Sequence, residues 1–198
     1  MKRRIKHVTV LGSGIMGSGI AAHFANIGVE VLLLDIVPFE LTEAEQKKGL
    51  TKEDKAVRNR IATESLAKLV KASPALLYKK EFAERISVGN FDDDLPKIKN
   101  TDWIIEVVVE RLDIKKSVYE KIEQFRKPGT LVSSNTSGIP INMLVEGRSD
   151  DFKKYFAGTH FFNPVRYLPL LEIIPTNDTD AEIVKFYMEY GAKFLGKT

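Results

Sequence analysis

One histidine and one carboxylate in the last quarter of the chain have the types and the spacing of an acid–base pair. His160 lies in an apolar run that predicts a strand over residues 155–161, and Glu172 follows twelve positions later in a second such run, over 170–174. A turn at Asn163 and Pro164 would let the second strand return beside the first. A carboxylate beside an imidazole fixes its tautomer and stabilises the imidazolium, as a base that accepts a hydroxyl proton requires. The alternative is a buried core histidine and an unrelated surface carboxylate.

A glycine cluster near the N-terminus has the spacing of a phosphate-binding turn. Gly12, Gly14 and Gly17 fit the pattern G-x-G-x-x-G between a β-branched run and a helical pattern that starts at Ile15 and Met16. The first glycine permits a tight turn, the second lets the backbone approach a pyrophosphate, and the third allows close packing of helix on strand. The N-terminus of the helix would hold the phosphates.

An acidic residue follows this cluster at the distance that a ribose contact requires. Asp35 comes eighteen positions after Gly17, at the end of the apolar run 29–35. A carboxylate there can bind a ribose diol and repels a 2′-phosphate, and Ile36 and Val37 offer no cation. The sequence therefore predicts NAD rather than NADP, against the alternative of a structural glycine turn with a surface aspartate.

A polar cluster at residues 134–137 follows another predicted strand. Its hydroxyls could simply satisfy backbone groups of a turn. At the carboxyl end of a parallel strand, however, such a loop faces the cofactor crevice of an open sheet.

Taken together, these motifs resemble the L-3-hydroxyacyl-CoA dehydrogenases in the right order over nearly the whole chain. The resemblance rests on the segments GSGIMGSGIA from Gly12, EVVVE from Glu106 with Lys115 beyond it, SNTS from Ser134, and GTHFFNP from Gly158 with Glu172 beyond it.

The resemblance implies oxidation of a (3S)-3-hydroxyacyl-CoA to a 3-oxoacyl-CoA by NAD, as in fatty acid β-oxidation or hydroxybutyryl-CoA metabolism. It implies that His160 is the base, supported by Glu172, and that Ser137 and Asn163 hold the substrate oxygen. The implied cofactor contacts are Gly12, Gly14, Ile15, Met16, Gly17, Asp35, Ile36, Val109, Glu110, Lys115, Asn135 and Ser137. Glu110 and Lys115 could instead form an ordinary solvated pair.

The elements that position these residues alternate between strands and helices. Strands are expected at 7–11, 29–35, 86–88, 103–109, 130–133, 155–161 and 170–174, and helices at 15–27, 60–71, 112–125, 139–144 and 180–194. In the helix over 112–125, Ile114, Val118, Ile122 and Phe125 share one face. The alternation predicts an α/β fold of the Rossmann type, doubly wound, with a mostly parallel sheet covered by helices on both faces.

The domain organisation is expected to be one NAD-binding domain over residues 1–198 with a charged insertion at about 38–60. A weaker hypothesis is that Lys47, Lys48 and Lys52 in this insertion help to bind the phosphates of coenzyme A. In the family that the chain resembles, a helical domain follows Gly196 and Lys197 and supplies a further asparagine, much of the substrate cleft and the dimer contacts. Here it is expected to be missing, so catalysis by this chain is expected to be impaired and cofactor binding kept.

Composition excludes several other classes of function. The net charge of +3 gives no reason to expect a nucleic acid or membrane partner, and the absence of cysteine removes thiol chemistry. Two further histidines far apart make no metal site. No apolar run is long enough to span a bilayer, and a cytoplasmic protein is expected. The expected partner is an acyl-CoA substrate, with a homodimer or a larger fusion as the full-length form.

Two rival functions stay open. Related dehydrogenases with a similar first domain oxidise sugar acids or small hydroxy acids. A non-catalytic module that senses NAD is a rival of another class, although a sensor needs no base.

Overall fold

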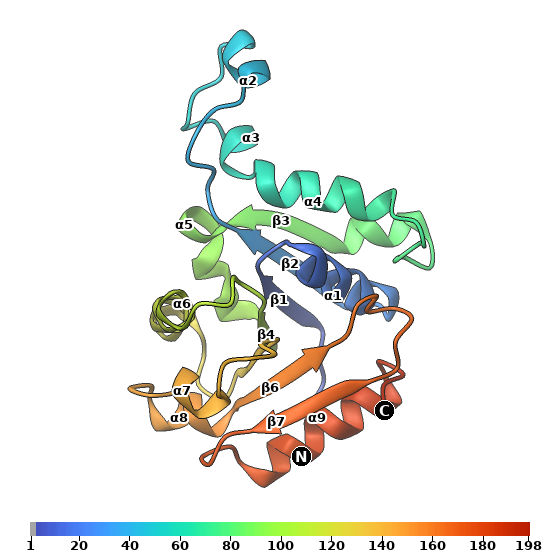
Figure 1. Ribbon diagram of the computed structural model, residues 1–198, viewed down its shortest axis with the longest axis vertical. Helices are drawn as coiled ribbons and strands as arrows, with labels where there is room; N and C mark the ends of the chain where they lie inside the picture. Colours follow the sequence, from blue (N-terminus) through green and yellow to red (C-terminus); the bar gives the residue numbers. More distant parts are fainter. Residues whose placement is uncertain (1–2) are drawn as a thin grey trace.

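The computed structural model describes residues 3–198, which form one seven-stranded sheet with helices on both faces (Figure 1). The strand order is β3-β2-β1-β4-β5-β6-β7, and every neighbouring pair is parallel except β6 and β7. The order reverses between β1 and β4, which is where an open α/β sheet places its ligand crevice. The predicted α/β, doubly wound Rossmann-type fold is confirmed.

The seven predicted strands and five predicted helices are all present, with bounds shifted by at most three residues. The described residues also form four short α-helices and two 3₁₀ helices that the sequence did not predict. The strands are β1 (His7–Leu11), β2 (Glu30–Asp35), β3 (Ile86–Asn90), β4 (Trp103–Glu106), β5 (Leu131–Ser134), β6 (Phe156–Phe161) and β7 (Leu171–Pro175). The helices are α1 (Ile15–Asn26), α2 (Glu43–Lys47), α3 (Lys55–Arg58), α4 (Arg60–Val70), α5 (Phe91–Asp94), α6 (Leu112–Phe125), α7 (Ile141–Leu144), α8 (Asp150–Lys154) and α9 (Ala181–Lys193), with 3₁₀ helices η1 (Lys80–Arg85) and η2 (Leu95–Asn100). None of these helices within residues 3–198 has the length and apolar character to cross a membrane.

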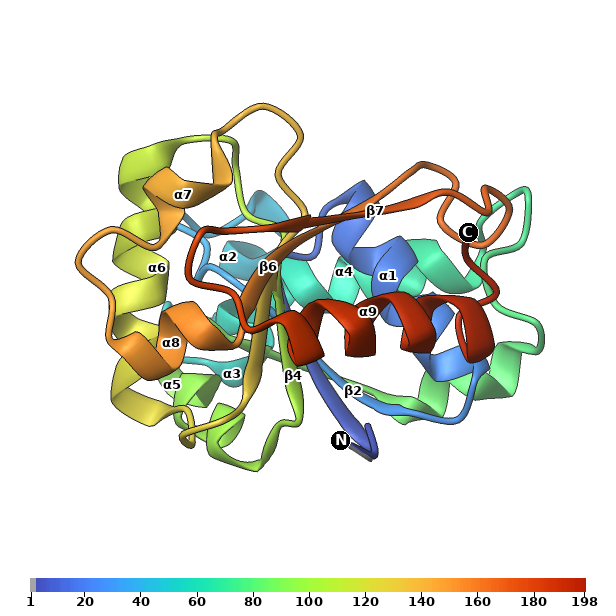
Figure 2. The same ribbon diagram turned by 90° about the horizontal axis from the view of Figure 1, so that it is seen from below.

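Successive residues of a strand belong alternately to two hydrophobic cores, one on each face of the sheet. Figure 2 shows α1, α4 and α9 on one face of the sheet and α6, α7 and α8 on the other. Trp103 and Ile105 of β4 belong to the core on the first face, whereas Ile104 between them belongs to the core on the second. Side chains of a strand point alternately to its two faces, so a strand buried on both faces is apolar at every position. Glu106, two residues after Ile104, therefore points toward α6.

Strand β4 ends three residues before the predicted end at residue 109. After Glu106, the backbone turns, and Val107 N donates to Leu11 O at 2.8 Å while Val108 N donates to the Glu106 carboxylate at 2.7 Å. The apolar run alone indicated a continuing strand, but a side chain that accepts a hydrogen bond from the backbone two residues on ends it.

The buried face of α6 is also displaced from the predicted one. Lys115, Tyr119 and Ile122 are its buried residues, whereas Ile114 and Val118 are only partly buried. The predicted face was drawn from the apolar residues alone, and so it left out Lys115 and Tyr119.

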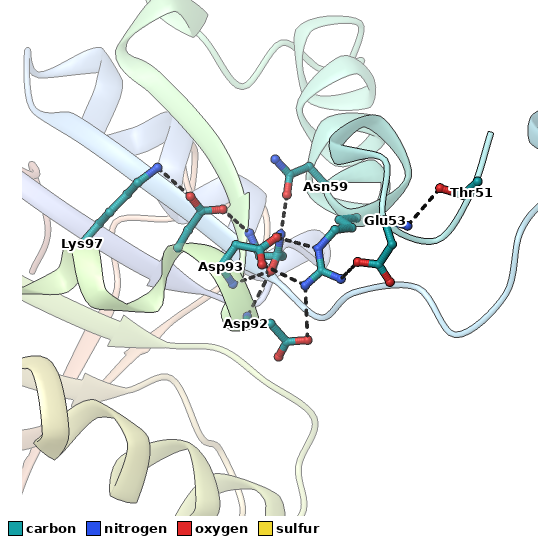
Figure 3. A network of polar contacts seen from close by, with 9 residues as sticks. Thr51, Glu53, Asn59, Asp92, Asp93 and Lys97 are labelled. Atoms are coloured by element: carbon teal, nitrogen blue, oxygen red, sulfur yellow. Dashed lines mark hydrogen bonds and ion pairs between the residues drawn. The ribbon is translucent and has the colours of Figure 1, made fainter.

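The charged insertion projects from the body of the domain as an arm, residues 38–59 (Figure 1). It contains two short helices, α2 and α3, which the sequence did not predict, and it leads into the predicted helix α4. Arg58 anchors its base through Nε and Nη2, which donate to Asp93 at 2.6 and 2.8 Å, and Glu53 and Asp92 lie nearby (Figure 3). The paired geometry of a guanidinium on a carboxylate fixes direction as well as distance, so the arm is a structured extension.

Candidate active site

The three glycines of the N-terminal turn have three different surroundings. Gly12 has a φ of +107°, and a Cβ there would lie 2.6 Å from Val107 O. A Cβ on Gly17 would lie 1.8 Å from Gly12 O, so α1 can approach the turn only because position 17 has no side chain. A Cβ on Gly14 would meet nothing within 4 Å. The backbone at Gly14 is therefore open to an approaching group, as the phosphate-binding pattern requires.

The N-terminus of α1 has no side-chain partner of its own. Its N-cap is Gly14, which offers no capping side chain, and its first turn has no acidic residue. The first amide groups of a helix lack partners within the helix and carry partial positive charge. Together with the open side of Gly14, this twelve-residue helix presents a site suited to an anion.

Asp35 lies at the end of β2, on one side of the glycine turn. Its Oδ2 accepts hydrogen bonds from the backbone and hydroxyl of Ser13, each at 2.6 Å, and its Oδ1 accepts one from Ile36 N at 2.8 Å. The carboxylate is thus fixed beside the turn, where the sequence placed it. Ile36 is exposed and adds no cation.

A cavity of about 310 Å³ lies on the other side of the turn, toward β4. Its lining comprises Gly14, Ile15, Met16, Gly17, Val107, Val108, Glu110, Lys115 and Asn135. Most of the predicted cofactor contacts are thereby brought together. Val109 is outside this lining, and its side chain is exposed.

Glu110 and Lys115 form a partly buried ion pair at this cavity. Lys115 is 1% exposed, and its Nζ lies 3.2 Å from Glu110 Oε2. The alternative of an ordinary solvated pair is therefore wrong. Burial raises the pKa of Glu110, but hydrogen bonds from Thr136 Oγ1 and Gly138 N and the charge of Lys115 outweigh it and lower the pKa to about 2.

His160 and Glu172 face each other across the one antiparallel pair of strands. They are register partners in β6 and β7, and His160 Nδ1 donates to Glu172 Oε2 at 2.8 Å. The imidazole is largely buried and the carboxylate half exposed. The residue after His160, Phe161, donates its N–H to Asn135 Oδ1 at 2.9 Å. Because Asn135 lines the cavity, this hydrogen bond places the His160–Glu172 pair next to it.

The structure does not join the two predicted oxygen-binding residues to His160. Ser137 is exposed, and its N–H donates to Glu110 Oε1 at 3.2 Å. Asn163 is exposed beyond the end of β6 and makes no hydrogen bond within the described residues.

Sequence reasoning gave no separate role to a fully buried carboxylate near the cavity. Glu106 is 0% exposed, and its carboxylate accepts hydrogen bonds from Lys115, Tyr119, Ser134 and Val108 N. The available signal was its position at the end of an apolar strand, because a buried carboxylate must be paired to be tolerated.

The arrangement fits a dinucleotide. The open glycine turn and uncapped helix suit a pyrophosphate, and Asp35 on one side and the cavity on the other leave room for two nucleoside halves. No cluster of three or more potential metal-ligating side chains is found within residues 3–198.

The fold and the glycine turn define a dinucleotide-binding domain of the Rossmann class. Residues 7–198 match the family described as 3-hydroxyacyl-CoA dehydrogenase, NAD binding domain, and the chain belongs to that family. The cofactor of this family is NAD, and the residues present fit it.

Known relatives cover this chain almost completely. A probable 3-hydroxyacyl-CoA dehydrogenase of Bacillus subtilis is 55% identical over 197 residues, which are 100% of this chain and 25% of that protein. A probable 3-hydroxyacyl-CoA dehydrogenase of Deinococcus radiodurans is 45% identical over 98% of this chain and 52% of its own length. The crystal structure of (S)-3-hydroxybutyryl-CoA dehydrogenase from Ralstonia eutropha is similar with a TM-score of 0.71 and 30% identity, over 98% of this chain and 62% of that one. This chain thus spans between a quarter and about half of the two curated relatives.

The low pKa of Glu110 predicts a pH dependence of stability. Between its ordinary value of 4.5 and about 2, the unfolded chain binds a proton at this position that the folded chain does not. The stabilisation is complete above pH 4.5 and is lost as the pH falls toward 2. Glu110→Gln is therefore expected to be less stable than the parent at pH 7, with a difference that shrinks below pH 4.5. Urea unfolding of both proteins at pH 7, 4 and 3 measures this, and a difference independent of pH would contradict it.

Proposed function

We propose that this chain is the cofactor-binding domain of an enzyme that oxidises a (3S)-3-hydroxyacyl-CoA to a 3-oxoacyl-CoA with NAD⁺. The observation that carries the proposal is the hydrogen-bonded pair of His160 and Glu172, next to the cavity in a domain of this family. A base is what an alcohol oxidation needs and a sensor of NAD does not. The names of the two relatives favour an acyl-CoA over a sugar acid or a small hydroxy acid.

To act as the base, the histidine must be in the tautomer that leaves one ring nitrogen unprotonated. Because Nδ1 donates to Glu172, Nε2 carries the free lone pair and accepts the proton of the substrate hydroxyl. The imidazolium that forms is stabilised by the carboxylate. NAD⁺, when bound, would accept the hydride that leaves the carbon bearing this hydroxyl. Ser137 and Asn163 are proposed to hold the substrate oxygen on which charge develops.

The cofactor contacts follow from the position of the turn between β2 and β4. We assign the pyrophosphate to Gly12, Gly14, Gly17 and the first residues of α1, Ile15 and Met16, and the adenosine ribose to Asp35 and Ile36. The cavity on the β4 side would take the nicotinamide half, with Glu110, Lys115 and Asn135 in its lining and Val109 and Ser137 at its edge.

The arm is proposed to assist substrate binding. Lys47 and Lys48 lie exposed at the end of α2, whereas Lys52 Nζ donates to Phe39 O at 2.6 Å. Only the first two are therefore free to meet the phosphates of coenzyme A, although the sequence grouped all three. The second helical domain, a homodimer or fusion partner, and a cytoplasmic location remain predictions.

Calorimetric titration with NADH and NADPH tests the cofactor assignment. Because Asp35 is held beside the turn as an anion, NADPH is expected to bind at least about tenfold more weakly than NADH. In Asp35→Ser, the gap should narrow, since the repelling charge is gone. Equal affinity of the parent for both cofactors would contradict the role assigned to Asp35. Failure to bind NADH would contradict the proposed cofactor site as a whole.

Replacement of the histidine tests the catalytic assignment. In the enzyme, His160→Ala is expected to lower turnover of acetoacetyl-CoA with NADH by about 10²- to 10⁴-fold. In this reverse direction the imidazolium is the general acid that protonates the substrate oxygen, and the same group accepts that proton in the oxidation. Glu172→Gln, which keeps the shape but not the charge, should give a smaller loss, and NADH affinity should be retained in both. Turnover of His160→Ala within a few-fold of the parent would refute the role of His160.

Neutralisation of the arm lysines tests the substrate assignment. Lys47→Ala with Lys48→Ala is expected to weaken acetoacetyl-CoA binding to the NADH complex, most clearly at low salt, where charge attraction is least screened. Lys52→Ala is the matched control, because its ammonium already has a backbone partner. Unchanged affinity in the double variant would contradict a contact with coenzyme A.

A further inference from the structure

The carboxylate of Glu106 accepts four hydrogen bonds in the interior of the protein. Oε1 accepts from Val108 N and from Lys115 Nζ, each at 2.7 Å, and Oε2 accepts from Tyr119 at 2.6 Å and Ser134 Oγ at 2.7 Å. The side chain is 0% exposed, so it can touch neither cofactor nor substrate. An ionised carboxylate is a pure acceptor with about four lone-pair sites, and here four donors fill them.

These bonds connect every segment on the β4 side of the cavity. Ser134 Oγ accepts from Thr136 N at 3.2 Å, Thr136 Oγ1 donates to Glu110, and Glu110 Oε2 lies 3.2 Å from Lys115 Nζ. Since Lys115 and Ser134 both return to Glu106, the contacts close into a ring. The ring joins the end of β4, the segment that follows it, α6 and the loop after β5. The last three of these carry the cavity residues Glu110, Lys115 and Asn135.

The charge of Glu106 also keeps Lys115 in place. Lys115 is 1% exposed, and its ammonium has three oxygen partners, namely Glu106 Oε1 at 2.7 Å, Glu110 Oε2 at 3.2 Å and Val108 O at 3.3 Å. The contact with Glu106 is the shortest of the three, and the Glu106 side chain is itself without solvent contact. Removing one partner of a buried ion pair leaves an uncompensated charge, which then seeks solvent or a new partner.

We infer that Glu106 is a positioning residue for the nicotinamide half of the cofactor site. It acts through Lys115, Glu110 and the loop at residues 135–137. It makes no hydrogen bond to Asp35, which is held by Ser13 and Ile36 N, or to the open side of Gly14, and these form the other half. This inference rests on the cofactor site proposed above, and it assigns the side-chain support of the nicotinamide half to Glu106.

Comparison of NADH with ADP separates the two halves. ADP contains the adenosine and the pyrophosphate but lacks the second ribose and the nicotinamide, so it reports on the turn and Asp35 alone. In Glu106→Gln, the amide NH₂ would face donors, and the clamp on Lys115 would lose its charge. The dissociation constant of NADH is expected to rise about tenfold while that of ADP stays unchanged, both by calorimetry on this chain.

Two further variants keep the test decisive. Tyr187→Phe removes a buried hydroxyl on the other face of the sheet, which donates to Val132 O at 3.2 Å, and it should leave the ratio of the two dissociation constants unchanged. Ser134→Ala opens the ring without removing a charge and should weaken NADH alone, by a smaller factor. It takes the place of Glu106→Gln if that variant does not fold.

The outcomes are distinct. An unchanged ratio of the NADH and ADP dissociation constants in Glu106→Gln, or in Ser134→Ala where that variant replaces it, would overturn the inference and leave Glu106 a purely structural residue. A parent chain that binds neither ligand would overturn the proposed cofactor site itself, and the inference with it.

Discussion

The close approach of helix α1 to the turn that precedes it sets the geometry of the whole site. A Cβ at position 17 would lie 1.8 Å from Gly12 O, and a Cβ at position 12 would lie 2.6 Å from Val107 O. Three pieces of backbone therefore meet where no side chain fits. This contact fixes the direction of the uncapped helix end and the path of the chain after β4, and so it fixes both the suggested phosphate position and the wall of the adjoining cavity.

The sheet brings His160 and Glu172 together by its strand pairing. Parallel strands place their carboxyl ends together, and β7 then returns antiparallel beside β6 so that His160 and Glu172 become direct register partners. Opposed residues of an antiparallel pair lie close enough for a side-chain hydrogen bond, which here is 2.8 Å long. A hydrogen-bonded pair on two adjacent strands needs no loop to hold it, and Asn135 connects it to the cavity through its hydrogen bond from Phe161 N.

Buried charge connects these parts at a considerable desolvation cost. Lys115 and Glu106 are almost without solvent contact, and such a pair is tolerated only when its remaining donors and acceptors are satisfied. Tyr119 shows the strength of this environment, because burial and the neighbouring Glu106 raise its pKa well above the usual value. A polar ring of this kind rigidifies the site only as a complete unit, since each missing bond exposes an unpaired group to a low-dielectric interior.

The sequence by itself determined the strands and helices of the sheet, the glycine turn with Asp35, and the pairing of His160 with Glu172. These depend on local patterns, such as apolar periodicity, turn residues and the length of one hairpin, which a single segment contains. Only the tertiary structure decided that β4 stops at Glu106, that Lys115 is buried, and that Arg58 of the arm finds Asp93, 35 positions away. From the sequence alone, a charged side chain is expected to be exposed to solvent unless its partners are known. Those partners come from other strands and helices, so the burial of a charge is a property of the fold and not of the segment that carries it.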